Sequence, residues 1–197
     1  MLAVAAGAER LTQAMRSLEA AFLIGVEGVT EIWLVRHGDC YEDMAEGPDP
    51  PLSPLGHRQA ELLAERVRRL GDVAVYSSPL RRAIETARVI TPDVREDPRL
   101  VEIDLELGEN GSLDFKEPPA SVIERMRAAV DDIVVANPGK HVVVVTHGIA
   151  LMAYISDVLR IEAGQLRVLP FYTSVSVVRA LGDRRMVGGI ADTAHLE

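Results

Sequence analysis

The sequence predicts an α/β protein, a three-layer sandwich in which helices flank a mostly parallel central sheet. From residue 31 onward, short apolar segments alternate with longer segments whose apolar residues recur at helical spacing. Residues 142–145 are an unbroken run of valines, which is typical of a central strand buried on both faces. Regular alternation of strands and helices favours a parallel sheet, because helices then connect strands that run in the same direction.

Length, composition and charge limit the classes of protein that fit. The 197 residues suffice for one substantial core but not for two ordinary domains. A net charge of −9 disfavours nucleic acid and anionic membrane surfaces as partners, since both would be repelled. The single Cys40 excludes an internal disulfide, and no stretch reaches the roughly 18 to 20 apolar residues of a membrane span. The apolar start of the chain is a poor signal peptide, so we expect a cytoplasmic protein.

Residues 1–30 are expected to form an N-terminal amphipathic helical extension, ahead of a domain that spans residues 31–197. The apolar side chains of this extension recur every three or four residues: Leu11, Met15, Leu18 and Phe22. Charged residues occupy the rest of the helical wheel, so the helix has one apolar face. Two arrangements bury such a face, which are packing on the helix's own domain and contact with a second copy in a homodimer.

Two Ser-Pro pairs predict where helices begin in the domain. Ser53 and Pro54 supply an N-cap and a first helical residue, and Gly71 is predicted to end that helix. Ser78 and Pro79 are predicted to open a second helix in the same way. Strands are predicted at residues 32–35, 73–76, 142–145 and 175–179.

The middle of the chain carries two further patterns. Residues 100–107 alternate apolar and acidic side chains, which predicts that Glu102, Asp104 and Glu106 share one face. The sequence from Ser121 to Glu124 fits a capping box, ahead of a helix that ends near residue 136. Later in the chain, Gly188-Gly189 predicts a turn.

Two of the predicted strands end in a histidine followed by a glycine, His37-Gly38 and His147-Gly148. Ligand sites of parallel sheets lie beyond the carboxyl ends of the strands, and a glycine there lets a ligand approach the backbone. A helix is predicted to begin at Gly148, and its free N–H groups would attract an anion. Arg36 adds a cation beside the first histidine. These residues predict an anion site and oppose a metal ion.

The ordered set of motifs resembles the histidine phosphatase superfamily, in its phosphoglycerate mutase-like branch. The resemblance covers residues 31–196 and rests on Leu34-Val-Arg-His-Gly38, Pro51-Leu-Ser-Pro-Leu-Gly56, the Arg-Arg-Ala-Ile-Glu-Thr-Ala87 segment, Leu100-Val-Glu-Ile103, Val144-Val-Thr-His-Gly148 and Asp192-Thr-Ala-His-Leu196. An Arg-His-Gly triplet is a weak signal by itself, whereas six motifs in this order are a specific one. The resemblance implies a phosphoglycerate mutase-like fold.

The resemblance also implies roles for particular residues. His37 is similar to the nucleophile that forms a phosphohistidine, and His147 to the second pocket histidine, which donates to the phosphoryl oxygens. Arg36 and Arg82 resemble the arginines that bind the phosphate, and Glu102 resembles the proton donor. Helical periodicity alone leaves Arg81 equal to Arg82, and alternation alone leaves Asp104 and Glu106 equal to Glu102.

The sequence therefore predicts a phosphomonoester hydrolase that needs no metal or cofactor and acts on a small phosphorylated substrate. The alternatives are a phosphomutase, a phosphohistidine-protein phosphatase and, in a different class, a phosphate-binding module without turnover. The segment from Glu102 to His147 is shorter than in cofactor-dependent mutases, which predicts an open site and favours hydrolysis. The acidic residues Asp39, Glu42 and Asp43 are expected to disfavour phosphoglycerates and bisphosphates by repulsion.

Overall fold

The computed structural model describes residues 2–41, 49–108, 112–162 and 165–197. Its centre is a six-stranded sheet in the order β3-β2-β6-β1-β7-β8. The strands of this sheet are β1 (Thr30–Arg36), β2 (Ala74–Ser77), β3 (Val94–Glu96), β6 (His141–Thr146), β7 (Val175–Leu181) and β8 (Arg184–Asp192). Strands β3, β2, β6 and β1 are parallel, whereas β7 and β8 pair antiparallel. The expectation of a mostly parallel sheet is confirmed.

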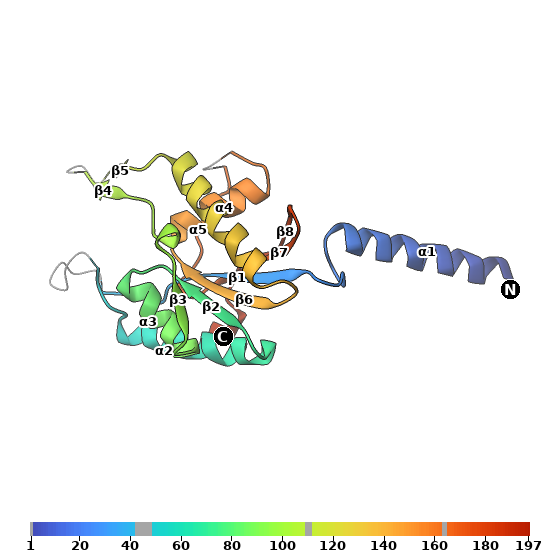
Figure 1. Cartoon of the computed structure of the whole chain (residues 1–197), viewed down its shortest axis with the longest axis horizontal. Helices are drawn as coiled ribbons and strands as arrows, with labels where there is room; N and C mark the ends of the chain where they lie inside the picture. The colour runs from blue at the N-terminus through green and yellow to red at the C-terminus, as the bar shows by residue number, and fades with distance from the viewer. Residues whose placement is uncertain (1, 42–48, 109–111, 163–164) are drawn as a thin grey trace.

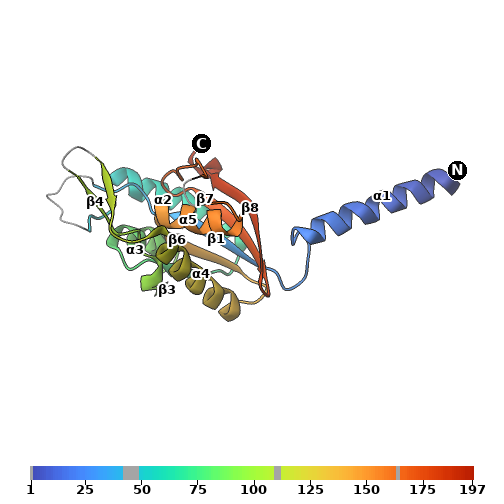
Figure 2. The same cartoon turned by 90° about the horizontal axis from the view of Figure 1, so that it is seen from above.

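Helices cover both faces of the sheet, as the sequence predicts (Figures 1 and 2). The helices are α1 (Leu2–Ala21), α2 (Pro54–Val67), α3 (Arg81–Ile90), α4 (Pro119–Ala136) and α5 (Gly148–Val158), with short 3-10 turns at Arg68–Leu70, Pro98–Leu100 and Ala194–Leu196. One core packs α4 and α5 against the sheet, and the other packs α2 and α3 against it. A small hairpin of β4 (Leu105–Leu107) and β5 (Leu113–Phe115) lies apart from the sheet.

The valines of β6 show why this strand is central. Val142 and Val144 belong to the core under α4 and α5, whereas Val143 and Val145 belong to the core under α2 and α3. All four are fully buried. Side chains alternate between the two faces of a strand, so an unbroken apolar run requires cover on both.

The start of α2 follows the sequence prediction, whereas the α-helix ends at Val67 and a 3-10 turn continues to the predicted Gly71. Ser53 is the N-cap, and its hydroxyl accepts a hydrogen bond from the N–H of Gly56 at 3.0 Å. Pro54 occupies the first turn, where its missing N–H costs nothing. Beyond the helix and the 3-10 turn, Gly71 has φ of 81°, a conformation that favours glycine.

Two of the predicted helix starts are wrong. Helix α3 begins at Arg81 with Leu80 as N-cap, so Ser78 does not open it. Helix α4 begins at Pro119, and the Ser121 hydroxyl donates to the Glu117 carboxylate at 3.2 Å. Proline favours the first turn of a helix, and this preference placed the start of α4 ahead of the predicted capping box.

Two of the other local predictions also differ from the structure. Residues 101–104 are irregular, and only Leu105–Leu107 of the alternating segment forms a strand. Gly188 and Gly189 lie inside β8 and do not form a turn. Gly188 leaves room for the Arg179 guanidinium, since a Cβ there would lie 2.7 Å from Nη1. The glycine thus lets the Arg179 side chain of the adjacent strand pass close to the backbone of β8.

Helix α1 extends away from the rest of the molecule in both views (Figures 1 and 2). The Arg184 guanidinium donates to the Ala21 carbonyl at 2.7 Å and holds the end of the helix. Met15 and Leu18 are about half exposed, so their apolar face has little cover within the chain. Among the described helices, none is both long and apolar enough to cross a membrane.

Candidate active site

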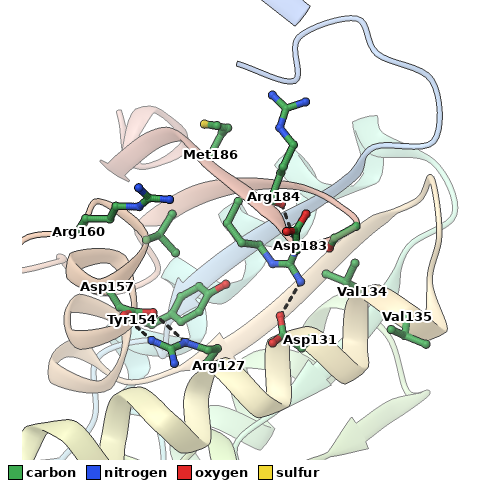
Figure 3. A pocket seen from close by; sticks show the side chains of 13 residues that line it. Arg127, Asp131, Val134, Val135, Tyr154, Asp157, Arg160, Asp183, Arg184 and Met186 are labelled. Atoms are coloured by element: carbon green, nitrogen blue, oxygen red, sulfur yellow. Dashed lines mark hydrogen bonds and ion pairs between the residues drawn. The ribbon is translucent and has the colours of Figure 1, made fainter. Parts of the chain in front are cut away.

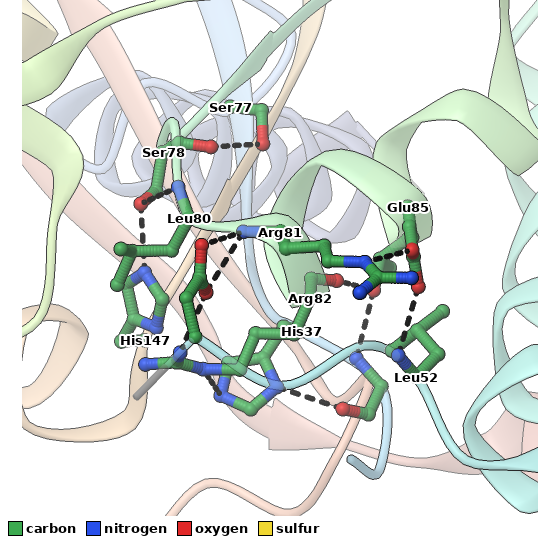
Figure 4. A network of polar contacts seen from close by, with 12 residues as sticks. His37, Leu52, Ser77, Ser78, Leu80, Arg81, Arg82, Glu85 and His147 are labelled. Atoms are coloured by element: carbon green, nitrogen blue, oxygen red, sulfur yellow. Dashed lines mark hydrogen bonds and ion pairs between the residues drawn. The ribbon is translucent and has the colours of Figure 1, made fainter. Parts of the chain in front are cut away.

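His37 lies at the carboxyl end of β1 and is only 5% exposed. Its Nδ1 lies 2.7 Å from the carbonyl oxygen of Gly38 (Figure 4). A carbonyl only accepts hydrogen bonds, so Nδ1 carries the proton. The other nitrogen, Nε2, then holds a lone pair and accepts from the Nε of Arg82 at 3.2 Å. This tautomer leaves Nε2 as the nucleophilic atom.

The surroundings of His37 keep its ring neutral. Burial lowers the pKa of His37 to about 3, and the charges of Arg82 and Arg36 add to this effect. The Gly38 carbonyl acts in the opposite direction and raises the pKa. A neutral imidazole is the form that can attack phosphorus, so the ring is ready to react at physiological pH.

His147 lies at the carboxyl end of β6, fully buried, with its ring centroid 5.1 Å from that of His37. Its Nε2 is 2.8 Å from the Ser78 hydroxyl oxygen. Within the described residues, its Nδ1 is buried and has no protein partner. Burial lowers the pKa of His147 well below its usual value, and the neighbouring His37 lowers it further. A neutral ring with a proton on Nδ1 can donate to a phosphoryl oxygen.

The two predicted arginines reach this place from different elements. Arg36 is the last residue of β1 and directly precedes His37. Its guanidinium lies 4.0 Å from the Tyr172 ring centroid and donates to the Pro170 carbonyl at 2.8 Å. Arg82 comes from the first turn of α3 and contacts His37. The Arg81 guanidinium instead donates to Glu85 at 2.8 Å and is half exposed. The structure therefore brings Arg82, and not Arg81, to the histidines.

Gly38 and Thr86 fix the position of the nucleophile. A Cβ on Gly38 would lie 2.8 Å from the carbonyl oxygen of Gly56, so the close approach of these backbones requires glycine. The Thr86 hydroxyl accepts from the Gly38 N–H at 2.9 Å and donates to the Arg82 carbonyl at 2.7 Å. One buried threonine thus links the loop after β1 to the helix that carries Arg82.

The Glu102 carboxylate is held by backbone N–H groups at the N-terminus of α5, the helix whose N-cap is His147. Its Oε1 accepts from the N–H groups of Ile103 and Ala150, both at 2.9 Å, and its Oε2 from that of Ile149 at 3.1 Å. The exposed N–H groups and positive end of a helix favour a carboxylate there. This places an acid at the start of the helix whose N-cap is His147.

The rival acids lie elsewhere. Asp104 is exposed, and its carbonyl accepts from the Lys116 N–H at 2.8 Å. Glu106 pairs with the Lys116 ammonium at 3.2 Å in the β4-β5 hairpin. Strict alternation had put all three acids on one face, but an irregular backbone at residues 101–104 turns Glu102 alone toward α5.

Arg125 was not singled out by the sequence, yet it holds the segment that carries Glu102. Its guanidinium donates to the carbonyl oxygens of Arg99 and Val101, each at 2.7 Å, and to that of Glu102 at 3.1 Å. An ion pair with Glu117 at 2.8 Å, both side chains largely buried, orients the guanidinium. An arginine on the inner side of an amphipathic helix is the sequence signal that could have revealed it.

The acidic loop is only partly described. The Asp39 carboxylate accepts a hydrogen bond from the Ser53 hydroxyl, which directs it to the start of α2. The Asp49 carboxylate accepts from the Arg81 N–H at 2.9 Å and lies 3.4 Å from the Arg82 guanidinium. Glu42 and Asp43, on which the expected repulsion of anionic substrates mainly rests, lie outside the described residues.

The described residues contain no metal site, and a large cavity lies away from the two histidines. Over the described parts of the chain, no group of three histidine, cysteine or acidic side chains could hold a metal ion. A cavity of about 680 Å³ lies between α4, α5 and the β7-β8 hairpin (Figure 3). Two of its arginines form ion pairs, Arg127 with Asp157 at 2.6 Å and Arg185 with Asp131 at 2.5 Å. The histidines and their arginines do not line it.

The chain is similar in sequence to known proteins of one family. The model of the histidine phosphatase superfamily, branch 1, matches residues 32–117 and 107–193. A probable phosphoglycerate mutase GpmB of Yersinia pestis is 30% identical over 205 residues, which cover 85% of this chain and 95% of that protein.

Solved structures with the same fold have lower sequence identity. A phosphoserine phosphatase of Entamoeba histolytica superposes with a TM-score of 0.72 at 22% identity, covering 85% of this chain and all of that one. A phosphoglycerate mutase of Bacillus anthracis has a TM-score of 0.70 at 17% identity, and the match covers 86% of this chain and 96% of that one. A mycobacterial glucosyl-3-phosphoglycerate phosphatase has a TM-score of 0.68 at 21% identity, and the match covers 82% of this chain and 98% of that one.

Proposed function

Because the chain belongs to branch 1 of the histidine phosphatase superfamily, we propose that it is a phosphomonoester hydrolase that works without a metal ion. The observation that carries this proposal is the buried, neutral His37, whose Nε2 lone pair faces Arg82. A phosphate bound there would lie among Arg36, Arg82 and His147. These groups supply positive charge and N–H donors where the phosphoryl group gains negative charge.

In the first step, Nε2 of His37 attacks phosphorus, and the bond from phosphorus to the alcohol oxygen breaks. Glu102 donates a proton to that oxygen, so the substrate leaves as a neutral alcohol. The hydrogen bond from Nδ1 of His37 to the Gly38 carbonyl stabilises the positive charge that the ring gains. Phosphohistidine remains on the enzyme, and Glu102 is now a carboxylate.

In the second step, water attacks the phosphorus of phospho-His37. Glu102 accepts a proton from that water, the bond from phosphorus to Nε2 breaks, and inorganic phosphate leaves. His37 returns to its neutral form and Glu102 to its protonated form, so the cycle closes without any other reagent. The three N–H groups around Glu102 hold its oxygens in place and favour the carboxylate form, which is the form that accepts the proton from water.

A phosphoglycerate mutase activity is the second candidate, because the Yersinia relative carries that name. A mutase must return the phosphoryl group to the substrate before water reaches it, which needs a covered site. The short segment between Glu102 and His147 supports hydrolysis, since it offers little chain for such a cover.

Product analysis separates the two activities. With p-nitrophenyl phosphate in the presence of EDTA, we expect release of inorganic phosphate at an unchanged rate. With 3-phosphoglycerate, a hydrolase releases inorganic phosphate, whereas a mutase yields 2-phosphoglycerate without net phosphate release. Rapid isomerisation with little phosphate release would replace the hydrolase proposal by the mutase. Binding of phosphate without turnover of any ester would indicate a non-catalytic phosphate-binding module.

For the N-terminal extension, residues 1–30, we propose a homodimer contact through α1. The support is its apolar face, on which Met15 and Leu18 are about half exposed. Sedimentation of the full chain should then give a dimer, and Leu18→Glu should shift it to a monomer. A monomeric full chain would contradict the proposal.

A further inference from the structure

An apolar cavity of about 360 Å³ lies beside the candidate active site. Its wall comes from α5, the β4-β5 hairpin and the segment that leads to β7. The lining includes Ile103, Phe115, Ile149, Met152, Leu166 and Leu169. None of the residues that line it carries a charge, and Ser156 is the one with a polar side chain. Cavities of this size and character accommodate the body of a small ligand.

Two residues that line the cavity also contact or adjoin the proposed proton donor, Glu102. Ile103 follows Glu102 directly, and Ile149 donates its N–H to the Glu102 carboxylate at 3.1 Å. Gly148, which also lines the cavity, follows His147. Glu102 and His147 are therefore each followed in the chain by a residue that lines the cavity.

That arrangement fixes which part of a substrate faces the cavity. The proton donor has to reach the oxygen of the leaving alcohol, since that oxygen takes its proton. The carbon atoms attached to this oxygen then begin next to Glu102, on the side of Ile103 and Ile149. The alcohol extends into the cavity, while the phosphate stays with His37 and the arginines.

We propose that the cavity binds the alcohol part of the substrate, and that the substrate is a phosphate monoester of a mainly hydrocarbon alcohol. This inference rests on the proposed function and names its substrate class. Carboxylate or hydroxyl groups of a glycerate or a sugar would lose their water in this cavity without gaining partners. A hydrocarbon chain gains from the same burial. The half-exposed ring of Phe115 at the rim leaves an opening for a longer chain.

A series of n-alkyl phosphates tests the proposal. From ethyl to octyl phosphate the leaving alcohol hardly changes in acidity, so the chemical step stays comparable. We expect kcat/KM to rise about threefold to fourfold per methylene until the cavity is filled, as burial of CH₂ groups implies. Glycerol 3-phosphate and 3-phosphoglycerate should fall at least tenfold below butyl phosphate. A flat series with retained p-nitrophenyl phosphate hydrolysis overturns the inference and leaves the proposed function intact.

A matched pair of variants locates the effect. Met152→Gln keeps the shape of a side chain that lines this cavity but makes it polar. Met186→Gln makes the same change at the edge of the larger cavity, away from the site. The ratio of octyl to ethyl kcat/KM should fall roughly tenfold in Met152→Gln, because a buried amide lacks a partner there. Met186→Gln should keep the wild-type ratio. Equal ratios in the two variants would contradict the assignment.

Binding of n-alkyl phosphonates, which cannot be hydrolysed, makes the result independent of turnover. Calorimetry should show affinity rising with chain length in the wild-type chain and in Met186→Gln, and a weaker rise in Met152→Gln. If the chain hydrolyses no ester but shows this binding series, the proposed function fails while the cavity assignment holds. Affinity independent of chain length overturns the assignment.

Discussion

The ends of β1 and β6 look alike in sequence, yet they hold their histidines in opposite orientations. His37 gives Nδ1 to a backbone carbonyl and keeps Nε2 for reaction, whereas His147 places Nε2 against the Ser78 hydroxyl and has Nδ1 without a protein partner among the described residues. A carbonyl can only accept, so it fixes the tautomer of His37. A hydroxyl can donate to Nε2, which lets His147 keep its proton on Nδ1. The partner of each ring, the adjacent Gly38 for His37 and the distant Ser78 for His147, thus distinguishes the nucleophile from the hydrogen-bond donor.

The largest effect is expected from the nucleophile. His37→Ala should reduce hydrolysis of p-nitrophenyl phosphate to the background rate, because His147 offers the phosphate a proton on Nδ1 and not a lone pair. Trapping with ³²P-labelled substrate should label the wild-type chain and not the variant, while thermal unfolding shows that the variant is folded. In the same experiment, His147→Ala should still become labelled, although more slowly. Labelled His37→Ala would show that the two histidines have exchanged roles.

A second test concerns Arg82, which donates a hydrogen bond to His37. Arg82→Ala should lower kcat by about 10² to 10³, as removal of one preorganised donor does. Arg81→Ala is the matched control, since its guanidinium is half exposed and pairs with Glu85. We expect it to change kcat less than about threefold. Equal losses in both variants would contradict the assignment of Arg82 to the phosphate.

The buried neutral rings also make stability depend on pH. The unfolded chain binds a proton at each histidine below about pH 6.5, whereas the pKa of folded His37 is about 3. The contribution of His37 is therefore complete above pH 6.5 and declines as the pH falls toward 3. Between pH 7 and pH 5 the free energy of unfolding should drop by about 2 kcal/mol through His37.

Urea unfolding of wild type and His37→Gln at both pH values measures this difference. The glutamine variant lacks the titrating ring, so its loss between pH 7 and pH 5 should be smaller by about 2 kcal/mol. Identical losses in the two chains would mean that folded His37 titrates normally.

The smallest effect is expected at the partner of His147. Ser78→Ala removes one hydrogen bond to Nε2, which should cost about 1 kcal/mol and lower kcat by roughly threefold to tenfold. Ser77→Ala is a control, because its hydroxyl donates to the Ser78 carbonyl at 2.8 Å and not to a histidine. A loss as large as that of Arg82→Ala would show that the hydroxyl contributes more than orientation of the ring.

Local patterns were reliable where a local cause decides the outcome. The valine run of β6 and the Ser53 N-cap depend on neighbours in the sequence, and both predictions are confirmed. Two patterns failed where a distant partner intervenes. Ser78 matched a helix start but contacts His147, and Gly188 matched a turn but accommodates Arg179 from the adjacent strand.

The sequence by itself determined the α/β class and the placement of His37 and His147 beyond two strands. Strand pattern and chain direction are enough to bring such residues to one edge of a parallel sheet. Helical periodicity left Arg81 equal to Arg82, alternation left three acids equal, and the family resemblance selected Arg82 and Glu102.

Only the tertiary structure decided the orientations of the two histidine rings. It also decided the hydrogen bonds by which Arg125 fixes the segment of Glu102, and the apolar cavity next to that segment. Arg125 lies on α4, Ile149 on α5 and Leu169 in a later segment, so no local pattern relates them. Hydrogen bonds and burial act between atoms that are close in space, and the folded chain alone brings these atoms together.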